Sequence, residues 1–175
     1  MPSRDLREFL DHLQGMGDLL HIQEEVDPKF EIAAYLRKAA LTGGPALLFE
    51  KVKGSDTPVV GGLFSSRERV HRALETSREG VVPKFIDALG SLIPTRQVAS
   101  GPCQEVVLLH EDVDLTQLPI PTYSGGDPTP YITAGVAISR DPEDGGKNAS
   151  IYRLQVKGRN RLGVFSLAHH HLNLQ

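Results

Sequence analysis

The stretch KNASIYRLQVKGRNRLGVFSLAHHH, residues 147–171, decides how the second half of the chain is interpreted. Two alternating apolar runs flank GRNR, residues 158–161, which is typical of a β-hairpin. We expect Arg159 and Asn160 at the centre of the turn, and this register gives a single apolar face across the two strands. The side chains expected on that face are Tyr152, Leu154, Val156, Gly163, Phe165 and Leu167.

Polar side chains continue this face towards the open end of the hairpin. They are Asn148, Ser150, His169 and His171. Amide oxygens and imidazole nitrogens are common metal ligands, so the pattern predicts a metal or anion site. The alternative interpretation is a solvated histidine triplet on the surface, similar to a tag.

Arg153 lies opposite Ser166 in this register, on the other face from Asn148. It is either an exposed cation or a clamp for an anion, because guanidinium binds carboxylate or phosphate through two parallel hydrogen bonds. If Arg153 and Asn148 serve one ligand, the strand must be irregular near its start, or the ligand must wrap around the strand end.

The first hundred residues have the periodicity of an α/β unit. Ser3 is expected to cap the first helix, and Asp27 the second with Pro28 in its first turn. In chain order we expect a helix at 3–17, a strand at 19–26, a helix at 27–44, strands at 45–52 and 57–64, and helices at 65–75 and 82–93.

After Pro94 the chain changes to short β-like runs separated by Pro and Gly. Strands are expected at 131–140 and 149–158. This change predicts two domains, residues 1–100 and 101–175. So few strands would leave open sheet edges, and we therefore expect a chain that is cut short or completed by another polypeptide.

Composition restricts the function classes. The net charge of −3 and pI near 6.2 argue against a nucleic-acid partner. The absence of an apolar signal segment and of a run of about 20 apolar residues predicts a cytoplasmic protein with no membrane partner. Cys103 is the only cysteine, which excludes a disulfide within the chain, and its apolar neighbourhood predicts a buried side chain.

Residues 148–171 resemble the N-x-[GS]-I-Y-R-x-Q…H signature of the UbiD family. These enzymes are reversible decarboxylases of aromatic and α,β-unsaturated acids that use prenylated FMN. Further segments match the family in the same order, at residues 3–39, 44–54, 58–70 and 112–145. The resemblance implies an α+β fold, with an N-terminal α/β domain followed by the first strands of a split β-barrel that binds flavin.

The resemblance also implies roles for single residues. Asn148 and His169 match ligands of a divalent metal, Mn²⁺ or a similar ion, although His170 or His171 could replace His169. The carbonyl of Ala149 matches a K⁺ contact. Arg153 matches the arginine that contacts cofactor and substrate carboxylate, and is the expected catalytic residue. The cofactor-binding residues implied are Asn148, Ser150, Ile151, Tyr152, Arg153, Ala168 and His169.

In the family, a glutamate that completes the metal site and two glutamates that pair with the arginine lie beyond residue 175. We therefore expect a truncated part of a UbiD-like carboxy-lyase, inactive alone because it supplies no acid for the arginine network. The resemblance also implies a homo-oligomer, a flavin prenyltransferase as cofactor supplier, and a small carboxylic acid as substrate. The alternatives are a non-catalytic small subunit or a metal-binding assembly module.

Overall fold

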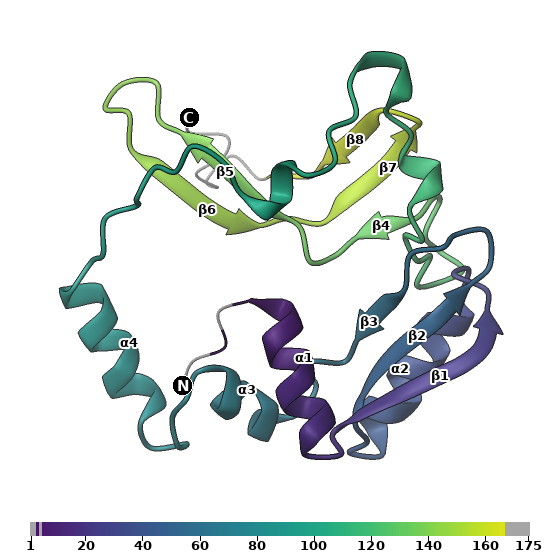
Figure 1. Ribbon diagram of the computed structural model, residues 1–175, viewed down its shortest axis with the longest axis horizontal. Coiled ribbons are helices and arrows are strands. Elements are labelled where there is room, and N and C mark those ends of the chain that lie inside the picture. The colour runs from purple at the N-terminus through teal and green to yellow at the C-terminus, as the bar shows by residue number, and fades with distance from the viewer. Residues whose placement is uncertain (1–2, 4, 167–175) are drawn as a thin grey trace.

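The computed structural model describes residue 3 and residues 5–166. Helices dominate the first part and short strands the second, which confirms an α+β fold (Figure 1). The elements are α1 (Leu6–Gly15), β1 (Leu19–Val26), α2 (Glu31–Leu41), β2 (Ala46–Val52), β3 (Val59–Gly61), α3 (Arg67–Ala73), α4 (Val81–Gly90), the 3₁₀ helices η1 (Pro102–Gln104), η2 (His110–Asp112) and η3 (Leu115–Gln117), β4 (Tyr131–Ile132), β5 (Val136–Arg140), β6 (Lys147–Ile151), β7 (Leu154–Gly158) and β8 (Arg161–Val164).

The first three strands form one mixed sheet in the order β1-β2-β3. β1 and β2 run parallel, joined by α2, and β3 returns antiparallel to β2. Two buried apolar clusters stabilise this unit, one beneath α2 and one beneath α1. The first contains Ile22, Val26, Ile32, Leu47, Phe49 and Val52, and the second contains Phe9, Leu13, Leu19 and Ala46.

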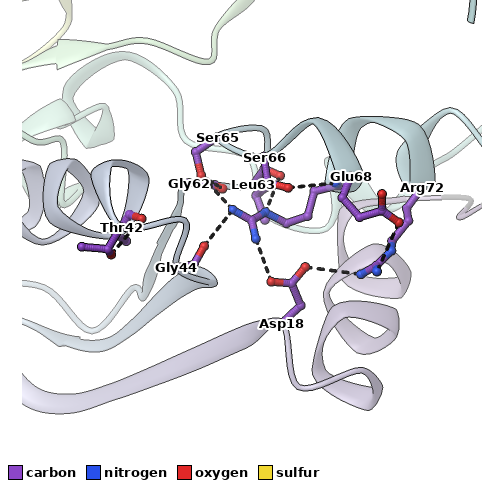
Figure 2. A network of polar contacts seen from close by, with 11 residues as sticks. Asp18, Thr42, Gly44, Gly62, Leu63, Ser65, Ser66, Glu68 and Arg72 are labelled. Atoms are coloured by element: carbon purple, nitrogen blue, oxygen red, sulfur yellow. Dashed lines mark hydrogen bonds and ion pairs between the residues drawn. The ribbon is translucent and has the colours of Figure 1, made fainter. Parts of the chain in front are cut away.

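A buried arginine joins α3 to the start of the sheet. Arg69 is 2% exposed, and its guanidinium binds the carboxylate of Asp18 at 2.7 Å. Its other donors reach the carbonyls of Leu63 and Gly44 and the hydroxyl of Ser65. These groups converge from three separate loops (Figure 2). Burial of the charge is therefore compensated by an ion pair and hydrogen bonds.

The first two helices begin at residues other than those predicted. Asp5, not Ser3, caps α1 by accepting a hydrogen bond from the Glu8 amide at 3.0 Å. α2 begins at Glu31, and Asp27 does not cap it. The Asp27 carboxylate instead accepts a hydrogen bond from the Lys29 amide at 2.8 Å, which forms a turn before the helix.

Contacts with a distant segment explain the late start of α2. The Phe30 amide donates to the Thr122 carbonyl at 3.0 Å, and the Thr122 amide donates to the Pro28 carbonyl at 3.1 Å. Phe30 has a φ of 77°, an unusual value for a residue with a side chain. Tertiary hydrogen bonds, rather than local capping, therefore fix this turn.

Each of the two strands expected at 131–140 and 149–158 is broken in the middle. The first is divided into β4 and β5 and the second into β6 and β7, so that β5 and β6 form one sheet and β4, β7 and β8 another. At the break the Tyr152 amide donates to the Gly135 carbonyl at 3.2 Å. A Cβ atom on Gly135 would lie 2.9 Å from Leu154 Cδ1, so a larger residue here would require the Leu154 side chain to move.

β7 and β8 form the expected hairpin, but the predicted register was wrong by one residue. Leu154 pairs with Val164 rather than with Phe165. The register shifts between Val156 and Gly158, where Lys157 is an extra residue in β7. The bulge exchanges the two faces of β8, so Leu162 and Val164, not Gly163 and Phe165, share the face of Leu154.

The segment between α4 and β4 differs from its predicted β-like character. The apolar run at 106–109 forms no strand and is exposed, because no neighbouring strand among the described residues pairs with it. Three short 3₁₀ helices occur instead. Cys103 is exposed, so the prediction of a buried thiol was wrong.

The strands β4 to β8 lie on the opposite side of the molecule from the first sheet, and α4 lies apart from both (Figure 1). Over residues 5–166 these strands do not close into a barrel. None of the helices in the described part of the chain is long and apolar enough to span a bilayer. The division into domains at residue 100 stays a prediction.

Candidate active site

The break between β6 and β7 gives adjacent residues different environments. Tyr152 is buried, whereas Ile151 and Arg153 on either side of it are exposed. Burial alternates residue by residue from 147 to 153, so Arg153 lies on the exposed face with Ala149 and Ile151, and Asn148 lies on the other face.

The residues before the break alternate between two faces of β6. Asn148 and Ser150 are half-buried, and the Asn148 amide donates to the Ser150 hydroxyl at 2.9 Å. Ala149 and Ile151 are exposed on the other face. Asn148 pairs with Ser139 of β5. It therefore belongs to the β5–β6 sheet, not to the β7–β8 hairpin on which the sequence placed it.

The histidine cluster lies outside the described residues. Ala168, His169, His170 and His171 all fall in the range 167–175. The predicted approach of His169 to Asn148 stays a prediction, as does the choice among the three histidines.

Arg153 has two close contacts in the β-rich half. Nη2 forms an ion pair with the Asp127 carboxylate. The guanidinium carbon also lies 3.7 Å from the centroid of the Tyr131 ring, which is a cation–π contact. The expectation that the chain supplies no acid to Arg153 was therefore wrong. Sequence analysis missed Asp127, although the turn residues SGGDP mark a fixed loop at this point.

An open pocket of about 470 Å³ adjoins this arginine. Its polar part consists of Arg153, which directly precedes β7, and of Gln155 and Lys157 in β7. Tyr131 and Phe165 contribute aromatic rings. Two cations beside aromatic rings suit a planar ligand that carries negative charge.

The turn of the β7–β8 hairpin is fixed by a second ion pair. Asp114 binds Arg159 Nε at 3.1 Å, and the Leu115 amide donates to the Arg159 carbonyl at 2.6 Å. Hydrogen bonds from the Thr116 hydroxyl and amide, followed by the charge of Arg159, lower the pKa of Asp114. The hairpin that carries the pocket is thus attached to the preceding loop.

The donor chemistry fits a hard metal ion only in part. The Asn148 side-chain oxygen and the Ala149 carbonyl are oxygen donors of the kind such ions bind. Among the described residues, however, no three His, Cys, Asp or Glu side chains cluster in a way that could hold a metal. A site at Asn148 therefore needs ligands from elsewhere, for which His169 is a candidate.

Two family profiles match consecutive parts of the chain. The N-terminal domain of 3-octaprenyl-4-hydroxybenzoate carboxy-lyase matches residues 10–89. The Rift-related domain of the same carboxy-lyase matches residues 96–175. The matched regions include all residues of the candidate site described above.

Solved structures agree with these matches. An evolved dimeric form of the UbiD-class enzyme HmfF from Pelotomaculum thermopropionicum, in complex with prFMN, is 44% identical over 98% of this chain, with a TM-score of 0.90. The closed form of vanillic acid decarboxylase from Sedimentibacter hydroxybenzoicus is 32% identical over 100% of this chain, with a TM-score of 0.91. Apo 3,4-dihydroxybenzoic acid decarboxylase (AroY) from Klebsiella pneumoniae is 29% identical over 98%, with a TM-score of 0.87.

The chain spans 38–40% of the length of these three proteins. Their folds match this one almost throughout the chain, and both family profiles match in the expected order. The chain belongs to the UbiD family of carboxy-lyases.

Proposed function

We propose that this chain forms the N-terminal part and the first cofactor-binding strands of an enzyme that reversibly decarboxylates an aromatic or α,β-unsaturated carboxylic acid, using prenylated FMN. The observation that carries the proposal is the environment of Arg153. This cation is held at a strand break beside a pocket with aromatic walls, in a chain 44% identical to a prFMN-bound enzyme. The substrate carboxylate would bind the guanidinium of Arg153.

Decarboxylation leaves an electron pair on carbon when CO₂ departs, and the side chains of this site supply no acceptor for that pair. When bound, the prenylated flavin supplies this electron sink. In the proposal, Asn148, Ser150, Ile151, Tyr152, Arg153, Ala168 and His169 hold the cofactor. Structures of HmfF with prFMN and with FMN support the choice of a flavin.

The metal assignment is also part of the proposal. Asn148 and His169, or one of the two histidines after it, would bind Mn²⁺ or a similar ion, and the Ala149 carbonyl would bind K⁺. A carboxylate from beyond residue 175 would complete the divalent site, because Asn and His alone form a weak site for such an ion. These residues would hold the metal ions, whose positive charge would neutralise the cofactor phosphate.

The proposed enzyme is a cytoplasmic homo-oligomer that obtains its cofactor from a flavin prenyltransferase. The dimeric form of HmfF supports the oligomer. Residues 1–100 and 101–175 are proposed as separate domains, with the first unit as a scaffold and the second as the cofactor-binding part. The chain alone is proposed to be inactive, since it spans 40% of the HmfF chain.

Isotope exchange tests the function. The chain would be extended by the region that corresponds to the remainder of its relatives and co-expressed with a flavin prenyltransferase. Incubation with ¹³C-bicarbonate and a panel of benzoic, furoic and acrylic acids should label the carboxyl carbon of at least one acid. Flavin-loaded protein that labels none of them would contradict the proposal, and FMN-loaded protein is the control.

A further inference from the structure

We propose that Asp127 and Tyr131 form a clamp that fixes the guanidinium of Arg153 before any ligand binds. We further propose that Asp127 is a positioning residue for the reaction proposed above. The first statement concerns this chain alone, whereas the second rests on the proposed function. The two are therefore tested by separate measurements.

The Asp127 carboxylate is held by its own loop. Its Oδ2 accepts a hydrogen bond from the Ser124 amide at 3.0 Å, and the Asp127 amide donates to the Ser124 carbonyl at 3.1 Å. The side chain is only 13% exposed. Oδ1 remains to bind Arg153 Nη2. The acid therefore has a defined position that does not depend on the arginine.

Tyr131 constrains the guanidinium in a second direction. Its ring lies against the planar face of the group, with 3.7 Å between the ring centroid and Cζ, whereas Asp127 binds an edge. Tyr131 is itself fixed, because it pairs with Gln155 of β7 and its amide donates to the Pro121 carbonyl at 3.1 Å. A face contact and an edge contact together restrict both tilt and rotation of the plane.

The clamp leaves the arginine accessible. Its side chain is 53% exposed and lines the pocket, so N–H donors other than the one that faces Asp127 can meet an incoming carboxylate. A ligand then meets a guanidinium that has already lost rotamer freedom, which reduces the entropy cost of binding. The negative charge of Asp127 also weakens the attraction of Arg153 for an anionic ligand. We therefore expect Asp127 to improve binding by orienting the guanidinium and not by adding charge.

The competing explanation is an ordinary surface ion pair, which contributes little. The same hairpin offers a comparison, because Arg159 pairs with Asp114 at 3.1 Å and is 64% exposed. Within the part of the chain that the structure describes, no aromatic ring lies over the guanidinium of Arg159. If the clamp is real, Arg153 should behave differently from Arg159.

Chemical modification of the unliganded 175-residue chain tests the clamp. Phenylglyoxal condenses with two guanidinium nitrogens, so an engaged Nη2 and a covered face should slow the reaction. Modification rates at single arginines would be read by peptide mass spectrometry, with exposed Arg161 as the internal reference. We expect Arg153 to react about fivefold or more slowly than Arg161, the scale of a charge-assisted hydrogen bond.

Matched variants show which residues slow the modification of Arg153. Asp127→Asn and Tyr131→Leu should each accelerate modification of Arg153, whereas Tyr131→Phe keeps the ring and should leave the rate unchanged. Asp114→Asn should increase the modification rate of Arg159 and leave that of Arg153 unchanged. Equal circular dichroism spectra would show that Asp127→Asn is folded, as expected for an isosteric change. An Arg153 rate equal to that of Arg161, or unaltered by Asp127→Asn, would overturn the clamp.

Kinetics of the extended, prFMN-loaded enzyme test the positioning role. Asp127→Asn should lower kcat about tenfold with a smaller change in KM, because misplacement of a reacting group affects the chemical step. Asp127→Glu should restore part of the loss. If Asp127→Asn increases the rate at which phenylglyoxal modifies Arg153 but leaves kcat unchanged, the positioning role is wrong and the clamp is supported. If no variant or wild-type protein exchanges carboxyl carbon, the proposed function has failed instead.

Discussion

Nη1 of Arg69 lies 2.7 Å from Oδ1 of Asp18, a residue 51 positions earlier in the chain, and the arginine side chain is 3% exposed. This pair connects α3 to the loop before β1. Since the N-terminal sheet has only three strands, contacts between its loops contribute strongly to its stability.

Arg69→Met should therefore lower the free energy of unfolding by about 3 to 5 kcal/mol, because it leaves the partly buried Asp18 carboxylate without its main partner. Urea unfolding followed by circular dichroism measures the change. The matched control is Arg72→Met, which removes the longer 3.4 Å contact of a more exposed arginine with the same acid. Arg72→Met should lower the free energy of unfolding by less than about 1 kcal/mol. Equal losses of stability in Arg69→Met and Arg72→Met would contradict the argument.

The lowered pKa of Asp114 predicts a pH-dependent contribution to stability. The unfolded state binds this proton more tightly, at a pKa of about 3.9. The contribution is therefore complete above that pH and is lost as the pH falls through the lower pKa of the folded state. The difference in Tm between wild type and Asp114→Asn should be constant from pH 7 to 5 and shrink below about pH 4. A difference that grows with acid would contradict the assignment.

Arg153→Lys should lower kcat/KM of the prFMN-loaded enzyme by about 100-fold or more, since lysine keeps the charge but loses the planar fork. Stability should change little, because Arg153 is half-exposed and the apolar core lies elsewhere. Arg161→Lys, in exposed β8, is the control and should retain activity. Near-wild-type rates for Arg153→Lys would exclude it as the carboxylate-binding residue.

Asn148 is predicted to bind Mn²⁺, weakly in this chain and more tightly in a longer protein that supplies a carboxylate. Calorimetry should show at least tenfold weaker binding for Asn148→Ala. Asn160→Ala, in the exposed hairpin turn, should have no effect. Equally tight binding by the chain and the longer protein would refute the argument that a ligand is missing.

Limited proteolysis tests the division at residue 100. The exposed segment at 91–109 should be cut first, because it has few backbone hydrogen bonds and many exposed side chains. The first sheet should survive as an intact fragment. Protection of this segment equal to that of β1 and β2 would contradict two separate domains.

Local signals predicted the first half of the fold well. The helices and strands up to residue 93 follow apolar periodicity, and their order was confirmed. The errors arose where more than one residue could serve as a cap. Asp5 and Glu8 form the pair that caps α1, whereas Ser3 lies too early. At α2, hydrogen bonds to Thr122 determine the turn, and no local pattern contains that contact.

The second half depends on features that a single sequence does not display. No Gly or Pro within β7 before Lys157 marks the bulge in the sequence. The hairpin register predicted without the bulge was therefore wrong by one position. The pairing of Arg153 with Asp127 joins residues that are 26 positions apart. Family resemblance identified Arg153 and Asn148 as candidates, but only the folded arrangement brought Asp127 and Tyr131 next to the arginine.

The extra residue at Lys157 also determines how insertions and deletions act on this hairpin. Side chains of a strand alternate between faces, so gaining or losing one residue between β7 and β8 exchanges the two sets in β8. Val164 and Phe165 both line the pocket, and such a change would exchange the faces on which their side chains lie and so reshape this wall. Relatives that differ by one residue in this turn should therefore present different walls to their substrates, even where every pocket residue of β7 is identical.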